Sequence, residues 1–191
     1  MLETKQIHFS LSILLSLSLS IINCLAISFS EFGNNYHQSI YFELDNKEAF
    51  KLAMSEAIEK EPNNPVLYYN LGVVSGELGE KEAAVSYYEK SIELDPSNEN
   101  SYLNLVALIL DGEQEIVNEM NNLGTSRADN LRYDELKKVR EDLYKQCVPI
   151  LKDLIAINNN VEAIRTLMNI YGTLGDNPGY VEMRNLLDQQ E

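Results

Sequence analysis

Apolar residues recur at three- and four-residue steps along most of this chain, which is the period of one face of an α-helix. The pattern predicts an all-α fold, with helices joined by short polar turns. The stretches that carry the pattern are 45–61, 65–78, 80–94, 99–110, 113–122, 131–157, 161–174 and 178–188.

Several predicted helix ends carry residues that terminate helices. Asn64 and Asn177 each precede a proline, and Asn98 lies before the stretch that begins at 99. Asparagine can accept a hydrogen bond from the first turn, and proline fits there because its missing N–H would be unpaired. Gly79 and Gly175 are placed to end helices, since glycine adopts the left-handed conformation at low cost. These signals predict helix starts after the asparagines and helix ends at the glycines.

One fixed interval separates Asn64 from Asn98 and recurs between residues inside the helices. The matched pairs are Tyr68 and Tyr102, Leu71 and Leu105, and Pro62 and Pro96. Such a regular period is typical of proteins built from stacked structural repeats. Gly72 and Ala84 are small, so we expect the two helices of one unit to cross there. Tyr88 is expected to fill the space between units.

This spacing of aromatic, Leu-Gly, Ala, aromatic and Pro residues resembles the tetratricopeptide (TPR) repeat, a helix–turn–helix unit. The resemblance implies a right-handed helical solenoid of about three units plus a capping helix. It also implies a surface that binds other proteins, because such units rarely carry chemistry.

The repeat pattern divides the chain into a hydrophobic leader at 1–30 and one solenoid domain at 31–191. The predicted units are a partial repeat at 45–62, a repeat at 65–98, a repeat at 99–160 with an inserted hairpin at 113–146, and a terminal repeat at 161–188.

The third unit does not close at the expected position. A regular unit would place the small residue of its second helix at 118, whereas the best match is Cys147, so the unit contains a long insertion. We therefore expect a long helical arm that projects from the solenoid. Pro149 should kink it, because proline cannot donate to the carbonyl four residues back. Cys147 itself lies on an apolar stripe and is expected to be a buried hydrophobic residue.

Segments 118–124, 128–137 and 166–172 resemble a subgroup of TPR proteins from the bacterial phylum Bacteroidota. Members of that subgroup carry an extended hairpin near the C-terminus and are usually exported or attached to the cell envelope. The resemblance therefore implies an envelope location.

In TPR proteins the first helix of each unit lines a concave groove. Helical spacing assigns ten residues to it here: Val66, Tyr69, Asn70, Val73, Leu103, Asn104, Ala107, Leu110, Arg165 and Asn169. Asparagines at such positions hold the backbone of a bound peptide in this family. The predicted helices at 65–78, 99–110 and 161–174 contain no lysine. This absence argues against a groove in which lysines bind the C-terminal carboxylate of a peptide. An apolar peptide or an amphipathic helix fits best; alternatively, residues 36–44 or the arm cover the groove.

The leader contains no charged residue between Lys5 and Glu31, and residues 9–29 are long enough to span a bilayer. One interpretation is a secretory signal cleaved after Ala26, and another is a retained membrane anchor. A third is lipidation at Cys24, and a fourth is a start site that lies outside the natural protein. The first three favour an exported or membrane-associated protein.

The formal net charge of −15 makes contact with nucleic-acid phosphates repulsive. Residues 31–111 carry −10 and residues 112–160 only −2, so a basic or weakly charged partner would be steered to the repeats, unless the acids are simply solvated. The only histidines are His8 and His37, and the chain has no metal-ligand spacing, phosphate loop or nucleophile motif. We expect no catalytic residue, metal or cofactor.

Three hypotheses follow. The first is a protein-interaction scaffold of the bacterial envelope that uses the groove, the arm or both. The second is a structural subunit that packs against copies of itself without a foreign ligand. The third is an adaptor tethered to the membrane by residues 9–29.

Overall fold

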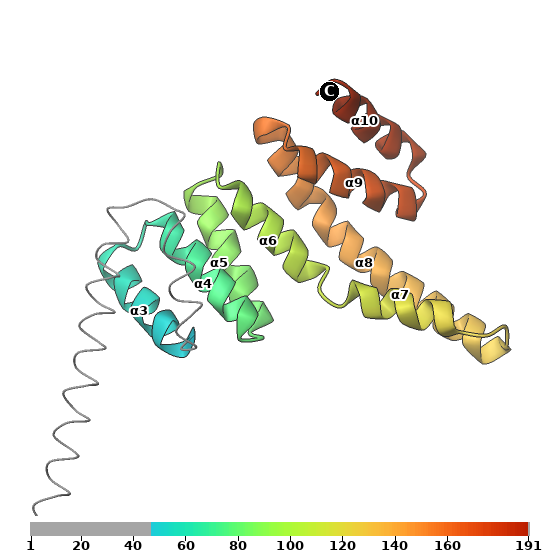
Figure 1. The fold of residues 1–191 in the computed structure, drawn as a ribbon, viewed down its shortest axis with the longest axis horizontal. Helices are drawn as coiled ribbons and strands as arrows, with labels where there is room; N and C mark the ends of the chain where they lie inside the picture. Colours follow the sequence, from blue (N-terminus) through green and yellow to red (C-terminus); the bar gives the residue numbers. More distant parts are fainter. Residues whose placement is uncertain (1–46, 191) are drawn as a thin grey trace, which may run out of the picture.

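The computed structural model describes residues 47–190, and this part of the chain is helical, as the apolar periodicity predicted (Figure 1). Its helices are α3 (Lys47–Lys60), α4 (Pro65–Glu77), α5 (Lys81–Leu94), α6 (Glu99–Ile109), α7 (Glu113–Asn122), α8 (Arg127–Asn158), α9 (Val161–Leu174) and α10 (Asn177–Asp188). Neighbouring helices pack in chain order from α3 to α6 and again from α8 to α10. The result is an all-α solenoid.

Helix α7 interrupts this order. Although α7 follows α6 in the chain, α6 and α7 each pack against α8. The C-terminal half of α8 therefore takes the place of the second helix in the third unit. We call α7 together with residues 127–143 of α8 the arm. Figure 1 shows the arm extending away from α3, α4 and α5.

Two of the predicted asparagine caps are confirmed. Asn64 accepts a hydrogen bond from the backbone N–H of Val66 at 3.1 Å, and Asn98 accepts one from Ser101 at 3.4 Å. The prediction for Asn177 is wrong. Asp176 is the cap and accepts from the backbone N–H of Gly179 at 3.0 Å, so Asn177 is the first residue of α10.

The start of α8 also differs from the prediction, because the helix begins at Arg127 and not near residue 131. Ser126 accepts from the backbone N–H of Asp129, and the Asp129 carboxylate accepts from the backbone N–H of Ser126. This reciprocal pair is a capping box, which adds a turn before the apolar periodicity begins. The helix continues through Pro149 to Asn158.

The core lies between the stacked helices. Its largest cluster joins α6, the second half of α8, α9 and α10, and it includes Leu151, Leu154 and Leu167. Cys147 belongs to the same cluster and is a free, buried thiol, as predicted. Burial raises the pKa of this thiol to about 11, so it stays protonated and unreactive at neutral pH.

Gly72 is required where α4 crosses α5. A Cβ at this position would lie 2.6 Å from Cε1 of Tyr88, which is closer than carbon atoms can approach. The Tyr88 ring is itself buried, so it has little room to move. The prediction of a close helix crossing is confirmed.

No helix within residues 47–190 is long and apolar enough to cross a membrane. The predicted leader, Cys24 and the segment 36–44 lie outside the described residues.

Candidate peptide-binding groove

Helices α4 and α6 are the first helices of successive units, and they touch each other directly. Tyr69 and Val73 on α4 are half-buried and pack on a cluster formed by Ala84, Tyr88 and Leu105. Each of the two side chains therefore has one side fixed by the core and another that is accessible. Neither helix contains a lysine or arginine.

A hydrogen bond connects the two helices across the predicted groove. The Asn104 side-chain amide donates to the hydroxyl of Tyr69, with 3.3 Å between the two atoms. The Tyr69 ring lies 6.2 Å from the ring of Tyr88 at an angle of 51°, a tilted arrangement that is favourable for aromatic pairs. Tyr69 and Asn104, which the spacing assigned to one groove, are thus neighbours.

Tyr88 was not assigned to the groove from the sequence, where it was expected to be a packing residue. The structure places its ring beneath Tyr69. Burial, and to a smaller extent the neighbouring Tyr69, raise the pKa of the Tyr88 phenol to about 12. The phenol is therefore neutral at physiological pH and packs as an apolar ring against Tyr69.

Asn70 differs from the other assigned residues because it is buried. Its side-chain nitrogen has no hydrogen-bond partner among the described residues. An enclosed amide donor without an acceptor costs about 1–3 kcal/mol. A ligand carbonyl could satisfy this donor only after the Asn70 side chain turns outward.

The remaining residues on these helices are accessible to different degrees. Leu103 on α6 and Leu110, the residue that caps this helix, are half-buried against the C-terminal core. Ala107 is exposed, and Val66 near the start of α4 is half-buried. Together with Tyr69 and Val73 they give the two helices a mainly apolar accessible surface.

Arg165 and Asn169 occupy exposed positions on α9. Helix α9 packs on α8 and α10. The hydrogen bond between Tyr69 and Asn104 joins only α4 to α6. The inclusion of the α9 residues in the same groove stays a prediction.

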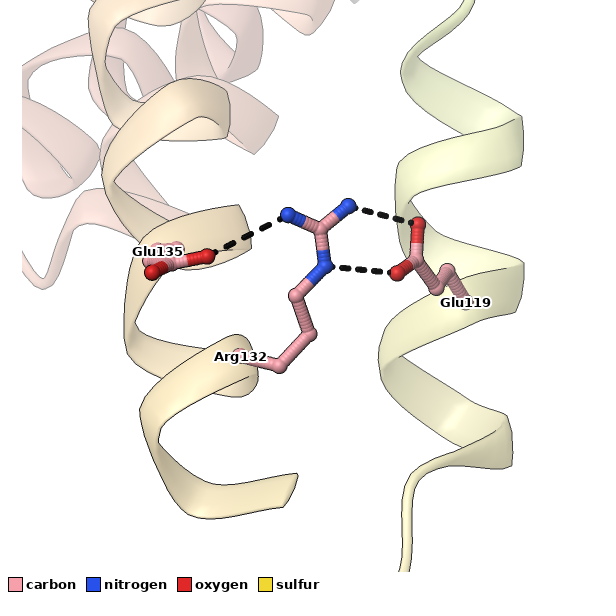
Figure 2. A network of polar contacts seen from close by, with 3 residues as sticks. All are labelled: Glu119, Arg132 and Glu135. Atoms are coloured by element: carbon pink, nitrogen blue, oxygen red, sulfur yellow. Dashed lines mark hydrogen bonds and ion pairs between the residues drawn. The ribbon is translucent and has the colours of Figure 1, made fainter. Parts of the chain in front are cut away.

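Sequence reasoning did not identify the polar contacts that hold the arm together. Figure 2 shows Arg132 on α8 between Glu119 on α7 and Glu135 on its own helix. The Arg132 guanidinium donates to both carboxylate oxygens of Glu119, at 2.7 and 3.2 Å, and to Glu135 at 3.2 Å. The hydrogen bond with Arg132 lowers the pKa of Glu119.

A second contact lies at the base of the arm. The Glu113 carboxylate accepts from Arg140 Nε at 2.7 Å and from the Tyr144 hydroxyl at 2.5 Å. Burial, followed by this hydrogen bond, raises the pKa of Tyr144. Glu113 is far along the chain from Arg140 and Tyr144. These contacts could be predicted only if the position of the turn between α7 and α8 were known.

Within the described residues no group of three His, Cys, Asp or Glu side chains could hold a metal ion. The assigned groove residues on α4 and α6 present aromatic, aliphatic and amide groups. Their arrangement is suited to binding an apolar surface with a few hydrogen bonds.

Comparison with known proteins agrees with the repeat pattern. Residues 66–98 match the family described as tetratricopeptide repeat. The chain therefore contains a tetratricopeptide repeat that covers α4, α5 and the turn to α6, and its fold is a TPR-type helical solenoid.

Two solved structures share the fold at low sequence identity. The structure described as MamA RS-1 ArsTM double mutant is 18% identical and covers 91% of this chain and 76% of its own, with a TM-score of 0.53. A structure from Bacteroides ovatus ATCC 8483, provisionally described as a protein binding protein, is 22% identical, with a TM-score of 0.57. The match covers 71% of this chain and 69% of the Bacteroides ovatus chain. Comparison with curated proteins gave no match.

The narrower resemblance to exported Bacteroidota proteins stays a prediction. A likeness at 22% identity shows a shared fold, and it carries neither location nor partner.

Proposed function

We propose that this protein is a protein–protein interaction scaffold that binds an apolar peptide or amphipathic helix across α4 and α6. The observation that carries the proposal is the pair Tyr69 and Asn104, which hydrogen-bond at 3.3 Å on an otherwise apolar surface. The presence of a tetratricopeptide repeat at 66–98 supports it.

The physical basis is a rigid apolar platform with few polar groups. Tyr69 and Val73 are held from below by Tyr88 and Leu105, so little side-chain freedom is lost when a ligand covers them. An apolar ligand side chain would displace water from these residues. The Tyr69 hydroxyl and the Asn104 amide provide hydrogen-bonding groups for the ligand backbone.

We also propose that the protein works in the bacterial envelope, either exported or held at a membrane through residues 9–29. The uncharged apolar stretch before Glu31 supports this location. The mass of the mature protein distinguishes the alternatives, because cleavage after Ala26, lipidation at Cys24 and retention of the whole leader give three different values.

Catalysis and nucleic-acid binding are not part of the proposal. The net charge of −15 opposes phosphate binding. In the groove the pKa rise of Tyr88 to about 12 keeps its phenol protonated, which does not favour a role as a general base.

To test the groove, peptides that bind the full chain are selected from a library, and the affinity of each is measured by fluorescence anisotropy. Tyr69→Ala combined with Leu103→Ala should weaken binding by at least about tenfold. Val181→Ala is the matched control, because Val181 is exposed on α10. Equal affinity of the double variant and the control would refute the groove.

The structural-subunit hypothesis makes a different prediction for the same variants. If the groove residues serve only self-association, the double variant changes oligomer size in light scattering and no selected peptide binds the wild type.

A further inference from the structure

The turn between α6 and α7 contains an aspartate that is followed by a glycine. Asp111 and Gly112 are both exposed, and they lie between the cap of α6 and the first residue of α7. The φ angle of Gly112 is 87°, in the left-handed region that favours glycine. Because glycine has no side chain, its backbone nitrogen is also open to the group that precedes it.

The backbone N–H of Gly112 has no hydrogen-bond acceptor within the described part of the chain, although its neighbours are paired. The N–H of Asp111 donates to the Leu108 carbonyl at 3.4 Å, and that of Glu113 donates to the Leu110 carbonyl at 3.0 Å. No hydrogen bond of the turn therefore has to break before the Gly112 nitrogen reacts. The Asp111 carboxyl group precedes this nitrogen at the distance that closes a five-membered ring.

The other described aspartates lack this combination. Asp95 precedes a proline, which has no N–H. Asp176 and Asp188 each precede a residue whose N–H donates to a backbone carbonyl. The rest lie inside α8, where the following N–H is used by the helix; they are Asp129, Asp134, Asp142 and Asp153.

We propose that Asp111 is a modification site at which aspartate isomerises to isoaspartate. The Gly112 nitrogen attacks Cγ of the protonated Asp111 carboxyl group, a C–N bond forms, and the hydroxyl leaves with the amide proton as water. Water then opens the resulting succinimide ring at one of its two carbonyl carbons. Opening at Cγ restores aspartate, whereas opening at the other carbon leaves the main chain running through Cβ and Cγ. Water is the only other reactant.

Lys81 on α5 restrains the reacting carboxyl group. Its Nζ lies 2.9 Å from Oδ2 of Asp111 and 3.3 Å from the Asp111 carbonyl oxygen. The side chains are 44% and 67% exposed, and an exposed ion pair is a weak restraint. The contact therefore slows the ring closure without preventing it.

The product changes the connection between the stack and the arm, which Figure 1 shows where α6 leads into α7. Isoaspartate adds one carbon atom to the main chain two residues before Glu113, whose carboxylate accepts from Arg140 and Tyr144. Helix α7 has no buried residue, so it can shift at low cost. Helix α8 runs unbroken from the arm into the stack. The modification should therefore loosen α7 and leave the stack intact.

The test incubates the full-length protein at mildly acidic pH in water labelled with a heavy oxygen isotope, with mild non-ionic detergent to cover the apolar segment 9–29. Each succinimide that hydrolyses takes up one labelled oxygen, and tandem mass spectrometry assigns the label and the isoaspartate to a residue. Asp111 should gain both, and Asp176 should gain neither. Asp111→Glu is the matched control, because it keeps a carboxylate near Lys81 but must close a larger ring, which forms far more slowly.

The same chain unfolded in urea provides the reference rate. If Asp111 stays unlabelled in the folded protein after the unfolded chain has been converted, the proposal is overturned. Label spread equally over Asp111, Asp129 and Asp176 overturns it as well, because the reaction would then not depend on the turn.

Hydrogen exchange tests the structural consequence. In the converted protein the amides of α7 should exchange faster than before incubation, and those of α9 should not change. The Asp111→Glu variant, incubated in the same way, reports any other damage. Conversion of Asp111 with unchanged exchange in α7 would refute the loosening of the arm.

Discussion

The stacked helices and the arm are held together by different forces. Leu151, Leu154 and Leu167 in the stack are completely buried. Helix α7 has no buried residue, and within residues 127–143 of α8 only Leu136 is buried. The arm depends instead on the contacts of Arg132 and Arg140 with glutamates on α7.

This difference predicts unequal local stability. Burial of a leucine side chain contributes about 1.5–3 kcal/mol, whereas an exposed ion pair contributes about 0–1 kcal/mol. The stack should therefore unfold as one cooperative unit. The arm should open first and at lower cost. An element that opens easily but projects from a rigid stack can adapt to a partner.

The largest expected effect is a cavity in the stack. Leu154→Ala should lower the free energy of unfolding by about 2–5 kcal/mol, because the buried side chain leaves a hole. Leu131→Ala removes the same atoms from an arm residue that is 58% exposed and should change stability by less than about 0.5 kcal/mol. Chemical denaturation measures both. Similar losses for the two variants would remove the distinction between stack and arm.

A smaller effect is expected at the crossing of α4 and α5. Gly72→Ala places a Cβ 2.6 Å from the Tyr88 ring and should cost about 1–3 kcal/mol through overpacking. Gly76→Ala is the matched control in the same helix, since its nearest neighbours would lie at 3.9 Å. Thermal unfolding followed by circular dichroism compares them. Equal melting temperatures would show that Tyr88 can move aside.

The base of the arm should respond next. Glu113→Gln weakens the acceptor for Arg140 and Tyr144 and should cost about 1 kcal/mol. The cost should appear as faster hydrogen exchange in α7, with little change in α9. Glu115→Gln, on an exposed position of α7, is the control. Faster exchange throughout the stack would mean that arm and solenoid unfold together.

The smallest effect concerns acidity at the tip of the arm. Arg132 lowers the folded-state pKa of Glu119, so the contact stabilises the arm above the unfolded pKa of about 4.3. That contribution is lost as the pH falls through the lower, folded pKa. Exchange in α7, corrected for intrinsic rates, should therefore accelerate in acid. Glu119→Gln should reduce the acceleration; an unchanged pH profile in this variant would assign the effect to other carboxylates.

Much of the fold could be predicted because its signals are local. Asn64 and Asn98 precede helices as expected, and α7 and α9 have the predicted bounds. Asn177 was misread because Asp176 is an equally good cap one residue earlier. The start of α8 was missed because the turn from Ser126 to Asp129 is polar and carries no apolar periodicity.

Of the candidate groove, the sequence could predict the proximity of one pair of residues. Helical spacing placed Tyr69 and Asn104 on corresponding faces of successive units, and the structure joins them. It could not show that Asn70 is buried or that Tyr88 lies beneath Tyr69. Those facts depend on how α5 packs between α4 and α6.

The sequence by itself determined the helices, the repeat period and the position of the insertion, since propensity, capping and periodicity act between residues near in the chain. Cys147 also belongs here, because its apolar stripe predicted burial. Only the tertiary structure decided that Arg132 meets Glu119 and that Arg140 meets Glu113. Charges on a helix surface have many candidate partners of equal chemistry, and the fold alone selects which of them come within reach.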